Sequence, residues 1–233
     1  MISLLHENTP FPPIEQALRK PNGLLAVGGS LSTQRLLEAY RHGIFPWFNA
    51  AEPILWWSPD PRMVLVPQEI KISRSLQKIL RNMDYEVRAD SAFEQVMCAC
   101  AAPRAGQSGT WIQQDMITAY TKLHQMGMAH SVEVWVDNEL AGGLYGVSIG
   151  RMFYGESMFS HRPNASKIAL AHLCAQLQRW SYGMIDCQMN TPHLASLGAR
   201  EIPRTEFILR LQELIHYPNR TSPWHFDQHE FVA

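Results

Sequence analysis

The sequence has little that would bind a metal or a nucleotide cofactor. It contains four cysteines (Cys98, Cys100, Cys174 and Cys187), which form neither a CxxC pair nor a zinc-type spacing. Its ten histidines include no HxH or HExxH motif, and neither GxGxxG nor a P-loop motif occurs. We therefore expect no metal and no cofactor. A nucleophilic Cys187 would need a positioned base that the sequence does not show, so we expect Cys187 to be a packing residue.

Long apolar runs and an excess of one charge are missing as well. No run approaches the roughly 18 apolar residues of a membrane span, and no basic residue precedes the apolar segment 2–5, unlike in a signal peptide. We therefore expect a cytoplasmic protein with reduced thiols and no membrane partner. The formal net charge is −1, so binding to nucleic acid would require a local basic patch.

The composition and texture of the chain predict two unequal folded parts. Apolar residues make up 46% and charged residues 18%, which suits an ordered globular protein. Residues 1–62 hold Pro-rich turns, a Gly-rich segment and a helix capped by Ser32, so we expect a small N-terminal domain with a core of its own. Residues 63–233 alternate between helical and strand-like patterns, which predicts a larger α/β (α+β) domain.

The larger part has clear candidate elements. Three consecutive strands are expected to be joined by hairpin turns near residues 138–139 and 149–150. Helices are expected over residues 73–81, 91–100, 113–126, 164–180 and 205–215, and strands over residues 85–88, 131–136, 139–149, 151–159 and 184–188.

The segment 184–188 (MIDCQ) places polar side chains in an apolar strand. Because side chains alternate along a strand, Asp186 and Gln188 are expected on one face and Cys187 on the other. A buried carboxylate or amide without a partner is costly. The pattern fits a reactive site and also a strand end whose polar groups are simply paired, and the spacing leaves both open.

Glu156 interrupts a second apolar strand, FYGESMF (153–159), and shares its face with Tyr154 and Met158. A carboxylate among aromatic residues is either desolvated for function or paired with a cation that the sequence does not reveal. The spacing favours neither.

The expected helix 164–180 carries Leu170, Leu173 and Leu177 in one stripe. Such a stripe is usually part of a core. It would also suit the wall of an apolar pocket that opens toward Glu156 and Asp186.

Four cations would align along one helix face at residues 71–81. Lys71, Arg74, Lys78 and Arg81 follow an i, i+3, i+7, i+10 pattern, and no acidic residue lies between positions 69 and 84 to pair with them. A solvated helix face and a phosphate-binding surface both fit, with the missing acidic partners favouring phosphate. Four tryptophans in Gly- and Pro-rich contexts would either stack on a nucleobase or fill a gap between domains, namely Trp47, Trp56, Trp57 and Trp111.

Read in order, ten segments resemble the bacterial leucyl/phenylalanyl-tRNA–protein transferases. No segment is specific alone, but together they span nearly the whole chain. The resemblance implies a small N-terminal domain followed by a domain with the acetyltransferase-like (GNAT) α/β fold. The segments are PNGLLAVGGSLS (21–32), GIFPWF (43–48), ILWWSPDPR (54–62), ISRS (72–75), GTWI (109–112), GGLYGV (142–147), FYGESMFS (153–160), NASK (164–167), IDCQ (185–188) and HLASLGAREIPR (193–204).

The resemblance also implies an activity and its partners. The expected reaction moves Leu or Phe, and less well Met, from aminoacyl-tRNA to proteins that begin with Arg or Lys, which marks them for degradation. We expect a monomer. The residues implied by the resemblance are Asp186, Gln188 and Glu156 at the reaction centre; Met158 and Ile185 in the side-chain pocket; Trp47 and Trp111 near the terminal adenosine; and, in part, Lys71, Arg74, Lys78 and Arg81 on the tRNA. We expect the helical stripe of Leu170, Leu173 and Leu177, with Leu144 and Phe153, to complete that pocket.

This chemistry needs neither ATP nor metal, because an aminoacyl ester is already activated. An α-amine with a pKa of about 8 is roughly one-tenth neutral at pH 7, so orientation and modest proton removal suffice. Asp186 is expected to orient Gln188 against the amine or to accept its proton through that amide. Glu156 and Asp186 together would favour an acceptor with a basic side chain.

Two other functions remain as alternatives. One is an acyl-CoA-dependent N-acetyltransferase, but the segment 160–166 has Pro163 and no glycine where such enzymes bind pyrophosphate. The other is a tRNA-binding module without catalysis, which would have no use for Glu156, Asp186 and Gln188 in apolar strands.

Overall fold

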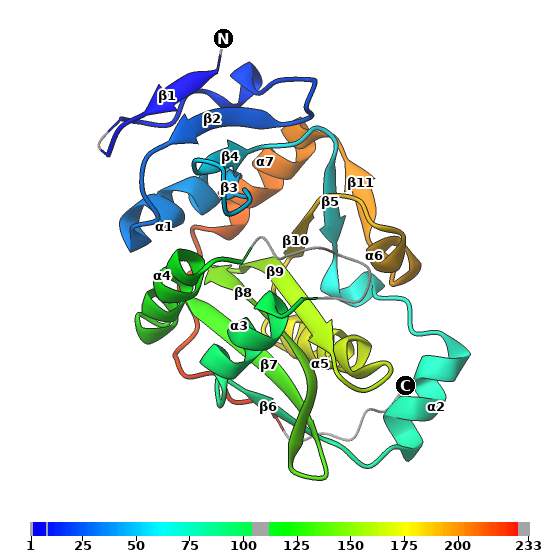
Figure 1. Cartoon of the computed structure of the whole chain (residues 1–233). Coiled ribbons are helices and arrows are strands. Elements are labelled where there is room, and N and C mark those ends of the chain that lie inside the picture. Colours follow the sequence, from blue (N-terminus) through cyan, green and yellow to red (C-terminus); the bar gives the residue numbers. More distant parts are fainter. Residues whose placement is uncertain (1, 8, 104–111, 228–233) are drawn as a thin grey trace.

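The computed structural model describes residues 2–7, 9–103 and 112–227, and two β-sheets organise them (Figure 1). The smaller sheet has four strands within the described residues, in the order β1-β2-β4-β3, and lies at the top of the view. Its strands β1 and β2 are parallel, whereas β4 is antiparallel to both of its neighbours. The strands are β1 (Ser3–Leu5), β2 (Leu24–Gly28), β3 (Phe45–Pro46) and β4 (Leu55–Trp57).

The larger sheet has seven strands in this part of the chain, in the order β11-β5-β10-β9-β8-β7-β6. The strands β6 to β9 form an antiparallel run, and β10 then pairs with β9 in parallel. The strands are β5 (Arg62–Leu65), β6 (Glu86–Ala89), β7 (Ala129–Val136), β8 (Glu139–Ile149), β9 (Met152–Ser160), β10 (Met184–Gln188) and β11 (Arg200–Ile202).

Helices cover both faces of the larger sheet. Residues of α3 and α4 join one buried cluster and residues of α5 join another, so the core is divided by the sheet (Figure 1). None of the helices within the described residues is long and apolar enough to cross a membrane. The helices are α1 (Thr33–Arg41), α2 (Arg74–Asn82), α3 (Phe93–Ala101), α4 (Gln114–Gln125), α5 (Ala165–Arg179), α6 (Pro192–Ser196) and α7 (Arg204–Leu214), with short 3-10 helices at Ile14–Gln16 and Pro67–Glu69.

All ten helices and strands expected in the larger part are confirmed, with bounds within two residues. The strands at 139–149 and 184–188 have the predicted bounds. The cap of α1 is also confirmed, because the Ser32 side chain accepts a hydrogen bond from the Arg35 amide. Positive φ angles at Asp137, Asn138 and Gly150 make the two hairpin turns.

The expected separate core of the N-terminal part is wrong. Leu36, Tyr40 and Trp56 belong to the same buried cluster as Tyr120 of α4 and Phe207 of α7. The apolar face of α1 therefore shares one buried cluster with both the smaller sheet and the larger part. This shared core fixes the position of the smaller sheet beside strands β9 and β10.

Candidate active site

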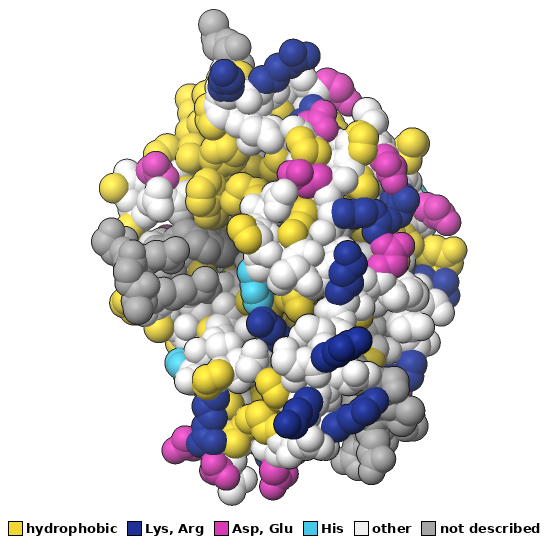
Figure 2. Space-filling view, turned by 90° about the vertical axis from the view of Figure 1, so that its right-hand side faces the viewer, with side chains coloured by type: hydrophobic (Ala, Val, Ile, Leu, Met, Phe, Trp, Pro, Cys, Tyr) yellow, Lys and Arg dark blue, Asp and Glu magenta, His cyan; other side chains and the backbone are white. Residues whose placement is uncertain are grey.

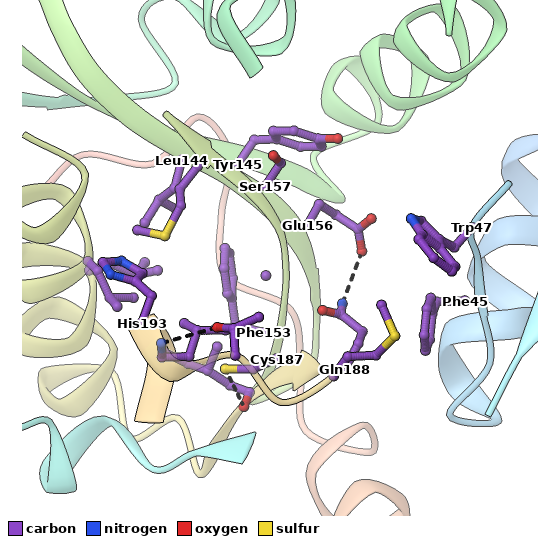
Figure 3. A pocket seen from close by; sticks show the side chains of 18 of the residues that line it. Phe45, Trp47, Leu144, Tyr145, Phe153, Glu156, Ser157, Cys187, Gln188 and His193 are labelled. Carbon is purple, nitrogen blue, oxygen red and sulfur yellow. Dashed lines mark hydrogen bonds between the residues drawn. The ribbon is translucent and has the colours of Figure 1, made fainter. Parts of the chain in front are cut away.

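A cavity of about 450 Å³ lies between the smaller sheet and the larger one, within the size range of small-molecule sites (Figure 3). Its wall combines three parts of the chain. Phe45, Pro46 and Trp47 come from β3 and the residue after it, and Leu170 and Leu173 come from α5. The remaining lining residues lie on β8, β9 and β10 and on the segment 189–194 that follows β10.

The cavity exists because two neighbouring strands diverge. The parallel pairing of β9 with β10 runs from Met152–Met184 to Tyr154–Asp186. Beyond Tyr154, β9 continues to Ser160 with β8 as its pairing partner. The residues immediately after the divergence, including Glu156 and Met158, line the opening.

Glu156 stands at this divergence and has three polar partners. The hydroxyl of Tyr40 donates to its Oε1 at 2.7 Å, and the hydroxyl of Tyr120 donates to its Oε2 at 3.1 Å. The side-chain amide of Gln188 donates to Oε1 at 3.5 Å (Figure 3). Burial raises the pKa of Glu156 to about 7, although both tyrosine hydrogen bonds act in the opposite direction.

Asp186 has a different environment. Its carboxylate is fully buried and accepts two hydrogen bonds from the Arg62 guanidinium, at 2.8 and 2.6 Å. A third nitrogen of Arg62 donates to the Gly43 carbonyl at 3.1 Å. The guanidinium carbon also lies 4.8 Å from the ring centre of Phe45 and 4.6 Å from that of Phe207. Asp186 is therefore neutralised by a cation inside the protein.

The expected alternation at the end of β10 is wrong. A register shift against β5 falls between Asp186 and Gln188, and Gln188 has a φ of 57°. Its backbone amide donates to Asp186 Oδ1 at 3.0 Å. As a result Cys187 and Gln188 both line the cavity, whereas Asp186 is not among the lining residues. Burial raises the pKa of the Cys187 thiol, which keeps it protonated and agrees with a packing role.

Six of the seven residues expected in the side-chain pocket line the cavity. They are Met158, Ile185, Leu144, Phe153, Leu170 and Leu173. Leu177 is the exception, because it is fully buried in the core around α5 and is not among the lining residues. It lies one helical turn beyond Leu173, about 6 Å along the axis, and that displacement takes it past the end of the cavity.

Trp47 is placed at the cavity, and Trp111 lies outside the described residues. The Trp47 side chain is 36% exposed, and its ring lies 5.6 Å from that of Trp57 in an edge-to-face contact. Its carbonyl accepts a hydrogen bond from the Trp57 indole at 2.7 Å. Trp47 thus presents a fixed and accessible ring beside the polar end of the cavity (Figure 3).

The four expected tRNA-binding cations are exposed, but they do not all share one helix. Arg74, Lys78 and Arg81 lie on α2, whose first turn is capped by Ser73. Lys71 precedes the helix and its backbone amide donates to the Leu197 carbonyl, so the alignment of four cations is wrong. Figure 2, viewed from the side on which α2 lies, shows several Lys and Arg side chains along the centre and lower part of this face.

Sequence reasoning missed the partners that define the two carboxylates. The sequence pattern predicts no polar role for Tyr40 or Tyr120. Arg62 is the first residue of the otherwise apolar strand β5 and is fully buried. The sequence does contain one indication of this ion pair, which is an arginine directly before the apolar run MVLV (63–66). A cation buried with such a strand needs an anionic partner.

Comparison with known proteins agrees over almost the full length. A family model described as leucyl/phenylalanyl-tRNA protein transferase matches residues 64–212, and one for its N-terminal domain matches residues 29–60. The leucyl/phenylalanyl-tRNA–protein transferase of Nitrosomonas europaea is 66% identical over 97% of this chain and 96% of that protein. That of Nitrosospira multiformis is 65% identical over 100% of both. The chain belongs to the leucyl/phenylalanyl-tRNA–protein transferase family.

Membership of the leucyl/phenylalanyl-tRNA–protein transferase family makes the chain an enzyme, an aminoacyltransferase. Among solved structures, L-PGS from Bacillus licheniformis has a TM-score of 0.39 at 10% identity, covering 73% of this chain and 57% of that one. A GCN5-related N-acetyltransferase from Kribbella flavida has a TM-score of 0.36 at 10% identity, covering 71% and 59%. Likeness of this degree carries no argument about function.

Proposed function

We propose that this transferase moves leucine or phenylalanine, and less well methionine, from aminoacyl-tRNA to the N-terminal α-amine of proteins that begin with Arg or Lys. Modification of this kind would mark the acceptor for degradation. The observation that carries the proposal is the division of one cavity into an apolar end and a polar end. The apolar end suits the donor side chain, and the polar end suits the reacting ester and amine.

The apolar end has the shape and chemistry for an unbranched or planar side chain. Leu144, Phe153, Leu170, Leu173 and Ile185 supply the apolar wall. Met158 adds a flexible thioether that adapts to leucine, methionine or phenylalanine. A donor that is branched at Cβ carries its bulk next to the ester carbonyl, where Glu156 and Gln188 meet.

The polar end suits a cationic acceptor. Glu156 is the one carboxylate among the described lining residues of the cavity. Since Arg62 already neutralises Asp186, the attraction for an acceptor's Arg or Lys side chain falls chiefly on Glu156. The proposed role of Asp186 is to fix the end of β10, and that of Gln188 is to orient the amine.

The tRNA would extend from the cavity over the exposed Lys and Arg side chains on and before α2. Trp47 would stack on the terminal adenosine, with Trp111 as its expected second ring. Arg74, Lys78, Arg81 and Lys71 would contact phosphates without reading sequence. We further propose that residues 1–62 and 63–233 form two domains that share one core, and that a monomer works in the cytoplasm, where aminoacyl-tRNA is available.

The test is a transfer assay with purified protein. Leucyl-tRNA and a peptide that begins with Arg should give a peptide extended by one leucine, whereas acetyl-CoA with the same peptide should give no product. Acetylation would support the acyl-CoA alternative, which the glycine-free segment 160–166 disfavours. Binding of tRNA without transfer would support the binding-module alternative.

A further inference from the structure

Two carboxylates lie near the proposed reaction centre, and they differ in whether a cation inside the protein neutralises them. Asp186 is enclosed with Arg62 and does not line the cavity. Glu156 does line the cavity, and its direct partners are neutral groups, the hydroxyls of Tyr40 and Tyr120 and the amide of Gln188. When environments separate two titratable groups in this way, they also separate the acid–base roles of those groups.

The contacts between Glu156, Tyr40 and Tyr120 outnumber the hydrogens that the two hydroxyl groups supply. Tyr40 and Tyr120 contact different oxygens of the carboxylate, and their hydroxyl oxygens also contact one another, so three oxygen-to-oxygen contacts form a ring that the carboxyl group closes. Burial and the Glu156 charge raise the pKa of both tyrosines, which keeps both hydroxyls protonated. Two hydroxyl hydrogens can fill only two of the three contacts. When Glu156 is protonated and donates to one tyrosine, that tyrosine can donate to the other, and all three contacts then hold a hydrogen.

From this geometry we infer that Glu156 is the base that takes the proton of the incoming α-ammonium, whereas Asp186 and Arg62 act only as positioning residues. The inference rests on the proposed function. One ammonium proton passes to a Glu156 carboxylate oxygen, and the freed nitrogen lone pair forms the C–N bond at the ester carbonyl. The C–O bond to the ribose breaks, and the ribose oxygen takes a second proton from the nitrogen. Protonated Glu156 then returns its proton to solvent.

The charged and titratable neighbours of Glu156 support this assignment. Tyr40 and Tyr120 face it from α1 and α4, and Gln188 from β10, while burial sets its pKa near 7. Asp186 raises and Arg62 lowers that pKa, so these two effects oppose one another. Tyr145, Cys187 and His193 also line the cavity. A base with a pKa near 7 is matched to an α-amine with a pKa of about 8.

The test compares wild type with Glu156→Gln in single-turnover transfer at saturating acceptor peptide, from pH 6 to pH 9. The variant keeps the side-chain size but cannot accept the proton. At pH 7 it should transfer at least about tenfold more slowly. The neutral fraction of the amine rises from about one-tenth at pH 7 to about nine-tenths at pH 9. The rate of the variant should therefore rise about ninefold, whereas that of wild type should rise about twofold as Glu156, with its pKa near 7, becomes fully ionised. The deficit of the variant should shrink about four- to fivefold from pH 7 to pH 9.

A second pair of variants keeps the inference testable if Glu156→Gln folds poorly. The Tyr120 hydrogen bond lowers the pKa of Glu156, so Tyr120→Phe should move the inflection of the wild-type pH profile to higher pH. Tyr182→Phe is the matched control. It also removes a buried hydroxyl, but one that is hydrogen-bonded to Ser148, at 2.7 Å, and not to Glu156. It should leave the inflection unchanged.

A deficit of Glu156→Gln that stays constant from pH 7 to pH 9 would overturn the inference. That result would mean that Glu156 only attracts the acceptor's Arg or Lys side chain, whose charge persists through pH 9. An inflection that does not move in Tyr120→Phe would overturn it as well. Failure of the proposed function is a separate result, because wild type would then transfer no leucine at any pH.

Discussion

The buried pair of Arg62 and Asp186 gives the sharpest prediction about stability. Arg62→Met keeps much of the side-chain volume but leaves the Asp186 carboxylate buried without its cation. The change removes two charge-assisted hydrogen bonds, at 2.8 and 2.6 Å, and a third bond to the Gly43 carbonyl at 3.1 Å. Breaking one side of such a pair costs about 3–5 kcal/mol. That is a large part of the roughly 5–15 kcal/mol that stabilises a typical protein.

The assay is urea unfolding at pH 7, compared with a surface pair in the same chain. Glu206 and Arg210 approach to 2.6 Å, but their side chains are 42% and 41% exposed. Arg210→Met should therefore change the free energy of unfolding by no more than about 0.5 kcal/mol. A loss below about 1 kcal/mol for Arg62→Met, or one no larger than the control, would refute the claim that this pair braces the end of β10.

Three further predictions concern the donor pocket, the tRNA surface and the sheet. Leu177→Ala should cost about 2–5 kcal/mol of stability and should slow leucine and phenylalanine transfer equally in single-turnover assays. Leu173→Ala, at the cavity wall, should instead change the ratio of the two rates. A change of this ratio in Leu177→Ala would show that Leu177 does contact the donor side chain. Arg74→Ala should weaken all aminoacyl-tRNAs equally and reduce the log–log salt slope of binding by about one, and an unchanged slope would leave α2 as a solvated helix. Gly146→Ala should lower the melting temperature, because its new Cβ would lie 2.2 Å from the Tyr154 carbonyl oxygen; an unchanged melting temperature would show that the strands can separate there.

The elements of the larger part were predictable because they follow local periodicity. Patterns at 139–149 and 184–188 gave the bounds of two strands, and Ser73 gave the start of α2. In the donor pocket, the resemblance implied Met158 and Ile185, and the helical spacing predicted Leu170 and Leu173. Helical spacing shows which residues share a face of the helix, but not how far along the helix the cavity extends. It therefore grouped Leu177 with Leu170 and Leu173, although the cavity ends one turn before Leu177.

Long-range pairing was not predictable from the residues. The partner of Asp186 is 124 positions away, and the two tyrosines that hold Glu156 come from 116 and 36 positions away. Period-two alternation also fails where a register shift occurs, as it does before Gln188. The sequence therefore identified the polar groups of the site without showing that one carboxylate is neutralised and the other is not.

The most direct test of the account is a competition among donors with wild-type protein. Equal amounts of leucyl-, phenylalanyl- and valyl-tRNA are mixed with one Arg-starting peptide and its N-acetylated copy, and the products are resolved by mass spectrometry. We expect leucine and phenylalanine on the free peptide, almost no valine, and no product from the acetylated copy. Valine transfer at a rate similar to that of leucine, or any extension of the acetylated peptide, would contradict it.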